Sequence, residues 1–350
     1  MFSPKFTITN KILVNVAKIE AAKEVIESAP LVPAYEAKFR QEAVVRAVHF
    51  GTHIEGNDLT FTQAQEVIEG RSISARDRDI KEVINYRKVM EFINTEGDKQ
   101  KAINKEVLLK IHKLTVSGLV KTEQTGSYRY VGVVLRGVKS GTVTYSAPPA
   151  SQVPKQVDQF LEWLNRDKDT HPVLKAAVTH YELVRIHPFT EGNGRTARAL
   201  ATLVLFKEDY DIKRFFSLEE HYDKDIQQYY KVLQNTTNQL VASESERDLT
   251  GWIEYFTEGL AAELGRIKDK VRTLSVDLRL KSKMGQVPLN ERQLKLVEYM
   301  QQNGQVSNNE WRGLLPMISD DTILRELKYL MKKGLVRKRG KTKAAVYVLK

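Results

Sequence analysis

The stretch PVLKAAVTHYELVRIHPFTEGNGRTARALATLVLFKEDY, residues 172–210, holds two helical patterns joined by a short polar loop. Residues 172–186 are apolar nearly all round, a pattern typical of a buried central helix. Pro188 pushes His187 out of helical geometry, so this helix has to end in a loop. The residues after the loop's glycines have the pattern of a second helix. The stretch therefore predicts a helix–loop–helix whose first helix is buried.

The loop and the first turns of the second helix spell HPFTEGNGRTAR, which we call the motif. Gly192 and Gly194 flank Asn193 and let backbone N–H groups come close to an anion at a helix N-terminus, where the helix dipole also favours phosphate. Arg195 and Arg198 are three residues apart, so they lie on one face of the helix and can bind phosphate oxygens. The motif therefore predicts a phosphate site.

Two further motif residues can take part in chemistry. Glu191 offers a hard oxygen ligand to a magnesium ion that bridges phosphates. His187 titrates near neutral pH, which suits a base that takes a proton from a hydroxyl group. A base, a phosphate site and a metal ligand within twelve residues favour phosphoryl or nucleotidyl transfer. Each feature alone is common in loops, but the spaced combination arises by chance in a chain of this length on the order of 10⁻⁸ of the time.

Helical spacing of apolar residues predicts further helices on both sides of this stretch. They are expected at residues 33–57, 79–97, 107–120, 153–167, 226–240 and 249–274. Residues 128–137 and 142–147 are instead rich in β-branched and aromatic residues and are separated by VKSG, which predicts a β-hairpin.

The composition excludes several classes of protein. The chain of 350 residues has no cysteine, so it uses neither disulfides nor thiolate chemistry, and a structural zinc site is not expected. No apolar run approaches the roughly 18 residues of a membrane helix, and the first residues lack the pattern of a signal peptide. We therefore expect a cytoplasmic protein without a membrane segment. His49 and His53 have a spacing that can bind zinc, but no third ligand is suggested, and helix packing is their expected role.

The last 63 residues, 288–350, are strongly basic. They contain 13 Lys or Arg against 6 Asp or Glu, so +7 of the net charge of +11 lies there. Helices at 289–304, 306–315 and 319–334, followed by a β-hairpin at 335–349, are predicted, as in a winged helix-turn-helix.

The wing of this module, residues 332–343, packs seven Lys or Arg into twelve residues, which favours contact with nucleic-acid phosphate. Asp320, Asp321 and Glu326 on the expected recognition helix oppose such contact. DNA binding and a protein-docking or homo-dimer contact role therefore both stay open.

The motif matches H-x-F-x-[DE]-G-N-G-R-x-x-R at every fixed position, and the chain thereby resembles the Fic family, the AMP-transferring "filamentation induced by cAMP" domain. The residues TGSYR at 125–129, the hairpin and APP at 147–149 resemble the family's flap and its exit. Tyr229, Tyr230 and Leu233 resemble its helix beside the adenine. The likeness covers about residues 30–260.

This resemblance implies a mainly α fold: a Fic-type helical bundle with a β-hairpin flap, plus a C-terminal winged-helix domain. It divides the chain into an N-terminal helical region with an inhibitory helix (1–105), a catalytic core (106–265), a linker (266–287) and the winged helix-turn-helix (288–350).

The resemblance also implies an activity, the transfer of AMP from ATP, with Mg²⁺, to a Ser, Thr or Tyr hydroxyl of a target protein and of the chain itself. His187 would be the base and Glu191 the metal ligand, and the hairpin around Arg136 would align the target by strand pairing. The residues implied in nucleotide binding are Gly192, Asn193, Gly194, Arg195, Thr196, Ala197 and Arg198, with Tyr230 bordering the adenine.

The residues THIEGN at 52–57 resemble the family's inhibitory helix, [ST]-x-x-x-E-[GN], which implies that Glu55 pairs with Arg198 and restrains transfer. The sequence departs from this pattern, because Gly51 stands where the family has a hydroxyl and Thr52 lies one position later. The alternative is that Glu55 is a surface residue near the end of a helix.

A second class of function is a DNA-binding regulator whose Fic-like part only senses nucleotide. His187 argues against this alternative, because sensing a nucleotide does not require a base.

Overall fold

The computed structural model describes residues 2–31, 33–99, 101–136, 143–239, 241, 246–274, 289–340 and 345–350. They form two compact units, which are described separately. The first comprises Met1–Lys23 and Glu42–Gly265, and the second comprises Glu24–Gln41 and Arg266–Lys350.

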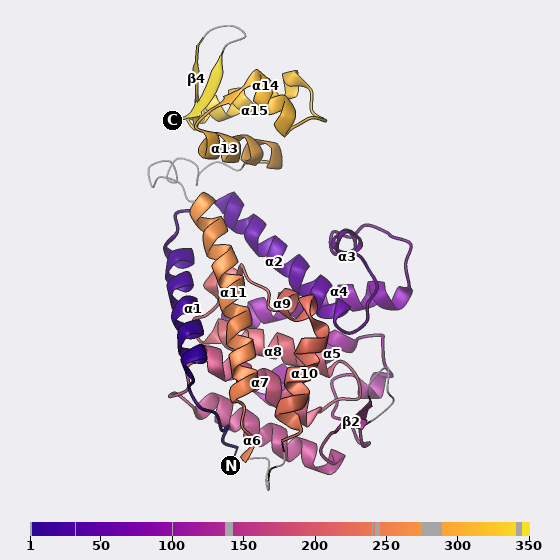
Figure 1. The fold of residues 1–350 in the computed structure, drawn as a ribbon. Coiled ribbons are helices and arrows are strands. Elements are labelled where there is room, and N and C mark those ends of the chain that lie inside the picture. Colours follow the sequence, from indigo (N-terminus) through magenta and orange to yellow (C-terminus); the bar gives the residue numbers. More distant parts are fainter. Residues whose placement is uncertain are drawn as a thin grey trace. The chain divides into compact units, whose positions relative to one another are not determined.

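Most of the first unit is helical (Figure 1). In chain order the helices that lie wholly or partly in it are α1 (Asn10–Ser28), α2 (Pro33–His53), α3 (Phe61–Ile68), α4 (Asp77–Gly97), α5 (Lys105–Val116), α6 (Val153–Arg166), α7 (Pro172–Ile186), α8 (Asn193–Lys207), α9 (Glu219–Lys224), α10 (Ile226–Thr237) and α11 (Thr250–Leu274). Parts of α1, α2 and α11 are assigned to the second unit. The mainly α fold expected from the sequence is confirmed.

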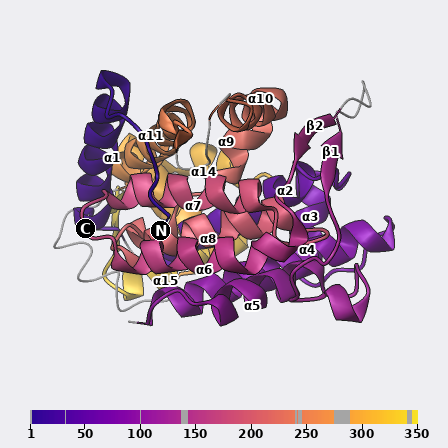
Figure 2. The same ribbon diagram turned by 90° about the horizontal axis from the view of Figure 1, so that it is seen from below.

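Helices α7 and α8 form the centre of the first unit. They pack against each other, α4 and α5 pack on α8, and α6 packs on α7 (Figure 2). Nearly every side chain of both central helices is buried, which confirms the buried helix expected at residues 172–186. The loop between them is therefore held at both ends by the best-packed part of the unit.

A β-hairpin lies at the margin of the same unit (Figures 1 and 2). Strands β1 (Val134–Arg136) and β2 (Val143–Ser146) pair antiparallel, with Val134 opposite Ser146. The hairpin predicted from β-branched composition is confirmed, although its VKSG turn lies outside the described residues. Because β2 contacts α10, the hairpin is close to Tyr229 and Tyr230.

The second unit contains the basic C-terminal module. Its elements are α13 (Glu291–Asn303), β3 (Val306–Ser307), α14 (Asn308–Leu314), α15 (Asp320–Lys332), β4 (Val336–Arg339) and β5 (Val346–Leu349), and the antiparallel sheet has the order β3-β5-β4. This order is compatible with the expected winged helix-turn-helix; residues 341–344 of the wing lie outside the described part.

Several boundaries differ from the expectation. Val306 and Ser307 form a strand rather than the start of a helix, because Ser307 and Glu310 make a capping box that starts the helix at Asn308. Helix α11 continues through the first nine residues of the expected linker 266–287, because its apolar residues stay buried as far as Leu274. Residues 275–288 lie outside the described part.

The N-terminal helical region expected at residues 1–105 is divided between the two units. Residues Glu24–Gln41 group with the second unit. Among the described helices, none is long and apolar enough to cross a membrane.

Candidate active site

His187 ends α7 in a left-handed backbone conformation, with φ of +50° and ψ of +58°. A side chain with Cβ adopts this conformation rarely and at a cost of about 1–3 kcal/mol. Arg129 holds the turn, since its Nε donates to the His187 carbonyl at 2.7 Å and its backbone N–H donates to the Pro188 carbonyl at 2.9 Å. The strained turn aims the imidazole into a cavity beside the motif, which we call the motif cavity.

The proton of the neutral His187 ring can be assigned from its contacts. Nδ1 lies 3.2 Å from the carbonyl oxygen of Val184, which can only accept, so Nδ1 carries the hydrogen and Nε2 carries the lone pair. Burial lowers the pKa of His187, and the nearby Arg129 cation lowers it further. The ring is therefore neutral at pH 7, with a basic nitrogen available on its other side.

The loop after His187 is held by Asn193. Its side-chain oxygen accepts from the Phe189 N–H at 2.9 Å, and its amide donates to the Phe189 carbonyl at 2.8 Å. Gly192 has a φ of +78°, and a Cβ there would meet a Val116 methyl carbon at 2.7 Å, so only glycine fits. Helix α8 begins at Asn193, and Asn193 and Gly194 line the cavity. The first N–H groups of a helix have no partner within the helix and favour an anion.

The motif cavity measures about 310 Å³. Besides the loop it is lined by α10 residues, and Tyr229 and Tyr230 stand with their ring centroids 5.1 Å apart. Tyr230 is 40% exposed and donates its hydroxyl to the Ile54 carbonyl at 3.3 Å. An aromatic wall opposite an anion site is a suitable shape for a nucleotide. The full lining is Glu55, Val184, His187, Thr190, Glu191, Gly192, Asn193, Gly194, Tyr229, Tyr230, Leu233, Gln234 and Thr237.

Glu55 lies in the turn after α2 and contacts the motif from outside. Its Oε1 accepts from Nη2 of Arg198 at 2.8 Å, and the same Nη2 donates to the Gly51 carbonyl at 2.9 Å. Burial alone would raise the pKa of Glu55, but the cations of Arg198 and then Arg195 hold it below its ordinary value. The carboxylate is therefore charged, and it engages the guanidinium that we expected to bind phosphate.

Gly51 shows why the hydroxyl residue is displaced in this chain. A Cβ at position 51 would lie 2.5 Å from Cε1 of Tyr86, which is too close. The Thr52 hydroxyl instead donates within its own helix, to the carbonyls of Val48 and His49 at 2.9 and 3.0 Å. Arg198 is thus held by the Gly51 carbonyl rather than by a side chain at that position.

Glu191 and Arg195 form an ion pair within the motif. Arg195 is 2% exposed, and its Nη2 lies 3.7 Å from Oε1 of Glu191. Glu191 also forms an ion pair with Arg78, a residue of α4 that the sequence did not single out.

The remaining predicted nucleotide contacts lie deeper. Thr196 and Ala197 are buried in the first turns of α8 and line none of the cavities around the motif. Arg198 is also buried, and it contacts Glu55 and Tyr229, which line the motif cavity. The side chain of Arg136 lies outside the described part.

His112 of α5 is a further site residue that sequence reasoning missed. Its ring stacks on Phe189 at a centroid distance of 3.7 Å, its Nε2 is 3.1 Å from the Glu191 carbonyl, and its Nδ1 accepts from the Gly126 N–H at 3.1 Å. Burial lowers its pKa to about 4. His112 therefore supports the motif loop as a neutral ring, and no sequence pattern marks it.

Magnesium fits the donors at this site. The described residues contain no group of three His, Cys, Asp or Glu side chains arranged to hold a metal ion. A magnesium ion, however, usually takes only one or two carboxylates together with phosphate oxygens, so Glu191 beside the anion site is a sufficient protein ligand. At the other candidate, His53 is paired with Asp223 at 2.6 Å and stacks on His49, in agreement with a packing role.

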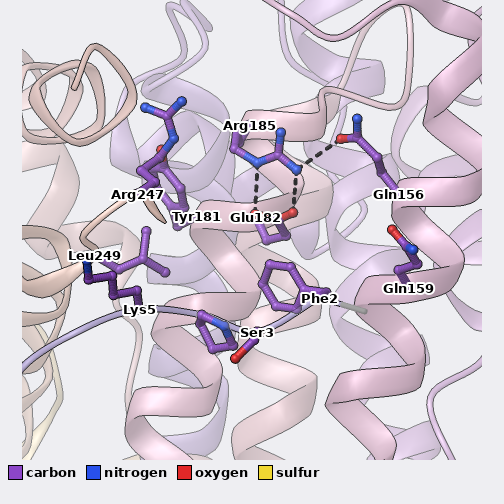
Figure 3. A pocket seen from close by; sticks show the side chains of 11 residues that line it. Phe2, Ser3, Lys5, Gln156, Gln159, Tyr181, Glu182, Arg185, Arg247 and Leu249 are labelled. Carbon is purple, nitrogen blue, oxygen red and sulfur yellow. Dashed lines mark hydrogen bonds and ion pairs between the residues drawn. The ribbon is translucent and has the colours of Figure 1, made fainter. Parts of the chain in front are cut away.

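Another cavity, of about 210 Å³, lies under the N-terminal segment and is drawn in Figure 3. Arg185 sits between the Glu182 carboxylate and the Gln156 amide, with hydrogen bonds of 2.9 and 3.0 Å. The residues that line it in the described part include none from the motif. Because this buried ion pair is already satisfied, the motif cavity is the better candidate for an active site.

The fold and the site thus define a helical domain in which His187, the glycine loop and the first residues of α8 line one cavity at the turn between two central helices. Residues 102–205 match the model of the Fic/DOC family, so the chain contains a domain of that family. The match ends before α10, which supplies Tyr229 and Tyr230.

Curated relatives carry the same family name. The chain is 30% identical over 218 residues to "Protein adenylyltransferase Fic" of Nematostella vectensis, covering 59% of this chain and 48% of the relative. It is 29% identical over 202 residues to the protein of that name from Culex quinquefasciatus, covering 55% and 38%. The chain thus spans about half of these relatives' length or less.

Solved structures agree on the fold. A Fic family protein from Desulfovibrio desulfuricans G20 superposes with a TM-score of 0.67 at 26% identity, covering 100% of this chain and 98% of the other. A Fic domain containing signaling protein from Bacteroides thetaiotaomicron VPI-5482 has a TM-score of 0.62 at 20% identity, covering 77% and 100%. The first of these is similar along its whole length, the C-terminal module included.

Proposed function

We propose that this chain transfers AMP from ATP to a Ser, Thr or Tyr hydroxyl of a target protein and of itself. The observation that carries the proposal is the neutral His187, whose Nε2 lone pair enters the same cavity as the N-terminus of α8. A nucleotide sensor needs only the second of these features. The names of the curated relatives support the same activity.

In the proposed reaction, Nε2 of His187 takes the proton of the target hydroxyl. The hydroxyl oxygen bonds to the α-phosphorus, the bond from that phosphorus to the bridging oxygen of the β-phosphate breaks, and pyrophosphate leaves. The N–H groups from Gly192 to Gly194 stabilise charge on the α-phosphate, Arg195 and Arg198 bind the outer phosphates, and Tyr230 borders the adenine. A magnesium ion held by Glu191 would neutralise phosphate charge.

Thr196 and Ala197 have a different role in this proposal. Both are fully buried, so they shape the first turns of α8 rather than touch the nucleotide. The flap hairpin contributes strand pairing with the segment that carries the hydroxyl.

The test is incubation with magnesium and ATP labelled on the α-phosphate, and in parallel with ATP labelled on the γ-phosphate. We expect α-label on protein, no γ-label, and loss of the α-label in His187→Ala with ATP affinity kept within a few-fold. Nucleotide binding without any transfer would support the alternative, a regulator that senses nucleotide. Equal loss of binding and transfer in His187→Ala would reassign this residue to nucleotide binding.

We propose that the basic module of the second unit binds duplex nucleic acid. On α15 the exposed Arg325, Lys328 and Lys332 recur at helical spacing and form one basic face. Glu326, which we expected to oppose phosphate, is buried and accepts hydrogen bonds from Arg292 and Gln293 of α13 at 2.9 and 2.6 Å. The repulsion between Glu326 and phosphate is therefore weaker than we expected from the sequence.

Asp320, the second acidic residue, is paired with Arg312. Docking of a protein and a homo-dimer contact remain the alternatives for this surface, and the salt dependence described in the Discussion separates them from nucleic acid.

A further inference from the structure

A second cavity, of about 260 Å³, adjoins the motif cavity and shares Glu55, Glu191 and Gly192 with it. We call it the arginine cavity, because Arg76, Arg78 and Arg195 line it and no aromatic residue does within the described part of the chain. The two cavities thus differ in chemistry, with aromatic rings in one and charged side chains in the other, where the three arginines stand beside the carboxylates of Glu55, Asp79, Glu82 and Glu191. A nucleoside triphosphate has the same division, with a flat base at one end and a polyanion at the other.

Arg195 brings unused hydrogen-bond donors to the arginine cavity. Its side chain is 3% exposed, yet among the described residues its Nε and Nη1 have no hydrogen-bond partner. The nearest carboxylates, those of Glu82 and Glu191, stand 3.5 and 3.7 Å away. A buried charge with unused donors is unfavourable unless something binds it, and a phosphate would satisfy those donors.

Arg78 is the cation of this cavity that lies outside the motif and is paired with the expected metal ligand. It lies in the first turn of α4, its side chain is 54% exposed, and it is paired with Glu191 and, at 3.3 Å, with Glu82. Arg76 is paired with Asp79 and Asp58 instead, at 2.8 and 2.6 Å. Arg78 is therefore paired with the Glu191 carboxylate, which a magnesium ion would need as a ligand.

We propose that the arginine cavity receives the terminal phosphates of the nucleotide and that Arg78 is a phosphate-binding residue, which Glu191 holds until its carboxylate turns to the metal ion. This inference rests on the proposed function for the identity of the nucleotide. The number of ion pairs stays the same in this exchange. Arg78 gives up the Glu191 carboxylate and gains a phosphate, and Glu191 gives up Arg78 and gains the metal ion. Arg78 then acts beside Arg195, from a helix outside the motif.

The experiment measures equilibrium binding of two ligands to the full chain by calorimetry, in the Glu55→Gly background so that both cavities are open. The ligands are AMP and an ATP analogue with a methylene group between its α- and β-phosphorus, which cannot transfer AMP. Arg78→Ala is compared with Lys88→Ala, an exposed cation farther along α4. Thermal melts confirm that both variants are folded.

With magnesium present, we expect Arg78→Ala to weaken binding of the analogue roughly 10-fold to 100-fold, as for a lost charged hydrogen bond, and to leave AMP within two-fold. Lys88→Ala should change neither. With a chelator instead of magnesium, Arg78→Ala should weaken binding of the analogue less. Without the metal ion, Glu191 stays paired with Arg78, so that Arg78 does not bind phosphate.

Unchanged or tighter binding of the analogue in Arg78→Ala would overturn the inference and make Arg78 only a restraint on Glu191. Equal weakening of AMP would also overturn it, since AMP has no terminal phosphates. Absence of AMP transfer by any variant would contradict the proposed function but not this binding contrast, so the two failures are distinguishable.

Discussion

At the scale of single residues, the contact between Glu55 and Arg198 is the restraint that we propose on the binding of a nucleotide. The carboxylate sits where Arg198 would meet the outer phosphates, and both charged groups are mostly withdrawn from solvent. A phosphate displaced by about 1 Å can lower a reaction rate roughly 10²-fold, so a single ion pair suffices as a restraint.

We predict that Glu55→Gly raises the rate of AMP incorporation at least about ten-fold, because it frees Arg198 for the phosphates. Glu55→Asp should raise it less, since a shorter carboxylate still reaches toward the guanidinium. The measurement is incorporation of α-labelled ATP into the chain itself. Adding Arg198→Ala to Glu55→Gly should abolish the gain. An unchanged rate in folded Glu55→Gly would return Glu55 to the role of a surface residue.

Gly51 gives a prediction about stability. Gly51→Ser places a Cβ 2.5 Å from the buried Tyr86 ring, and such overpacking costs about 1–3 kcal/mol of unfolding free energy. Gly251→Ser on α11 is the matched control, because a Cβ there meets nothing within 4 Å. Urea unfolding of both variants checks the prediction. Equal stabilities would mean that the Tyr86 ring moves aside without cost.

At the scale of elements, α5 supports the motif loop through one neutral ring. His112 bridges the Gly126 N–H and the Glu191 carbonyl, so the loop before the flap and the motif are tied to the same helix. This arrangement requires the unprotonated ring, since a protonated Nδ1 could not accept from Gly126.

The stability of the fold should consequently fall in acid. The pKa of His112 is lowered from 6.5 to about 4, so the unfolded chain binds its proton first as the pH falls. Its contribution is complete above pH 6.5 and is lost between about pH 6.5 and 4, by up to about 3 kcal/mol.

His112→Phe keeps the stacking on Phe189 but removes this titration and both hydrogen bonds. We predict a loss of about 1–3 kcal/mol at pH 7 and a smaller loss than wild type between pH 6.5 and 4. Urea unfolding at a series of pH values measures both. Curves of wild type and variant that stay parallel down to pH 4 would exclude His112 as the titrating group.

At the scale of the whole molecule, the charge is divided between two units of different chemistry. The motif site belongs to the first, and +7 of the net charge of +11 belongs to residues 288–350 of the second. Arg325, Lys328 and Lys332 of α15 are exposed and Glu326 is turned into the core, so Asp321 is the exposed acidic residue that remains beside these three cations.

We predict that the full chain binds mixed-sequence duplex DNA and that log K falls with log salt by about 0.9 for each phosphate neutralised. Arg325→Ala with Lys328→Ala should weaken binding and reduce that slope by about 2, whereas Lys295→Ala on α13 should change it little. Titrations by fluorescence anisotropy between 50 and 200 mM salt measure the slope (a range within which such contacts respond strongly). Binding that ignores salt would favour a protein-docking role.

The sequence alone determined the chemistry of the motif. The predicted base, anion site and metal ligand lie within twelve residues, so local spacing is enough to bring them together. Pro188 marks the end of the first central helix and Gly192 the start of the second. The helices and the hairpin were predictable for the same reason, since periodicity and β-branched composition are local properties.

Only the tertiary structure decided which residues act on the motif from elsewhere. Glu55 and Arg198 are 143 residues apart, and Glu191 meets Arg78 across 113. Contacts between residues so far apart in the sequence depend on how the helices pack, and local sequence patterns do not predict that packing. The same holds for Glu326 of α15, whose carboxylate opposes phosphate in the sequence but faces α13 in the fold, because buried donors there satisfy its charge.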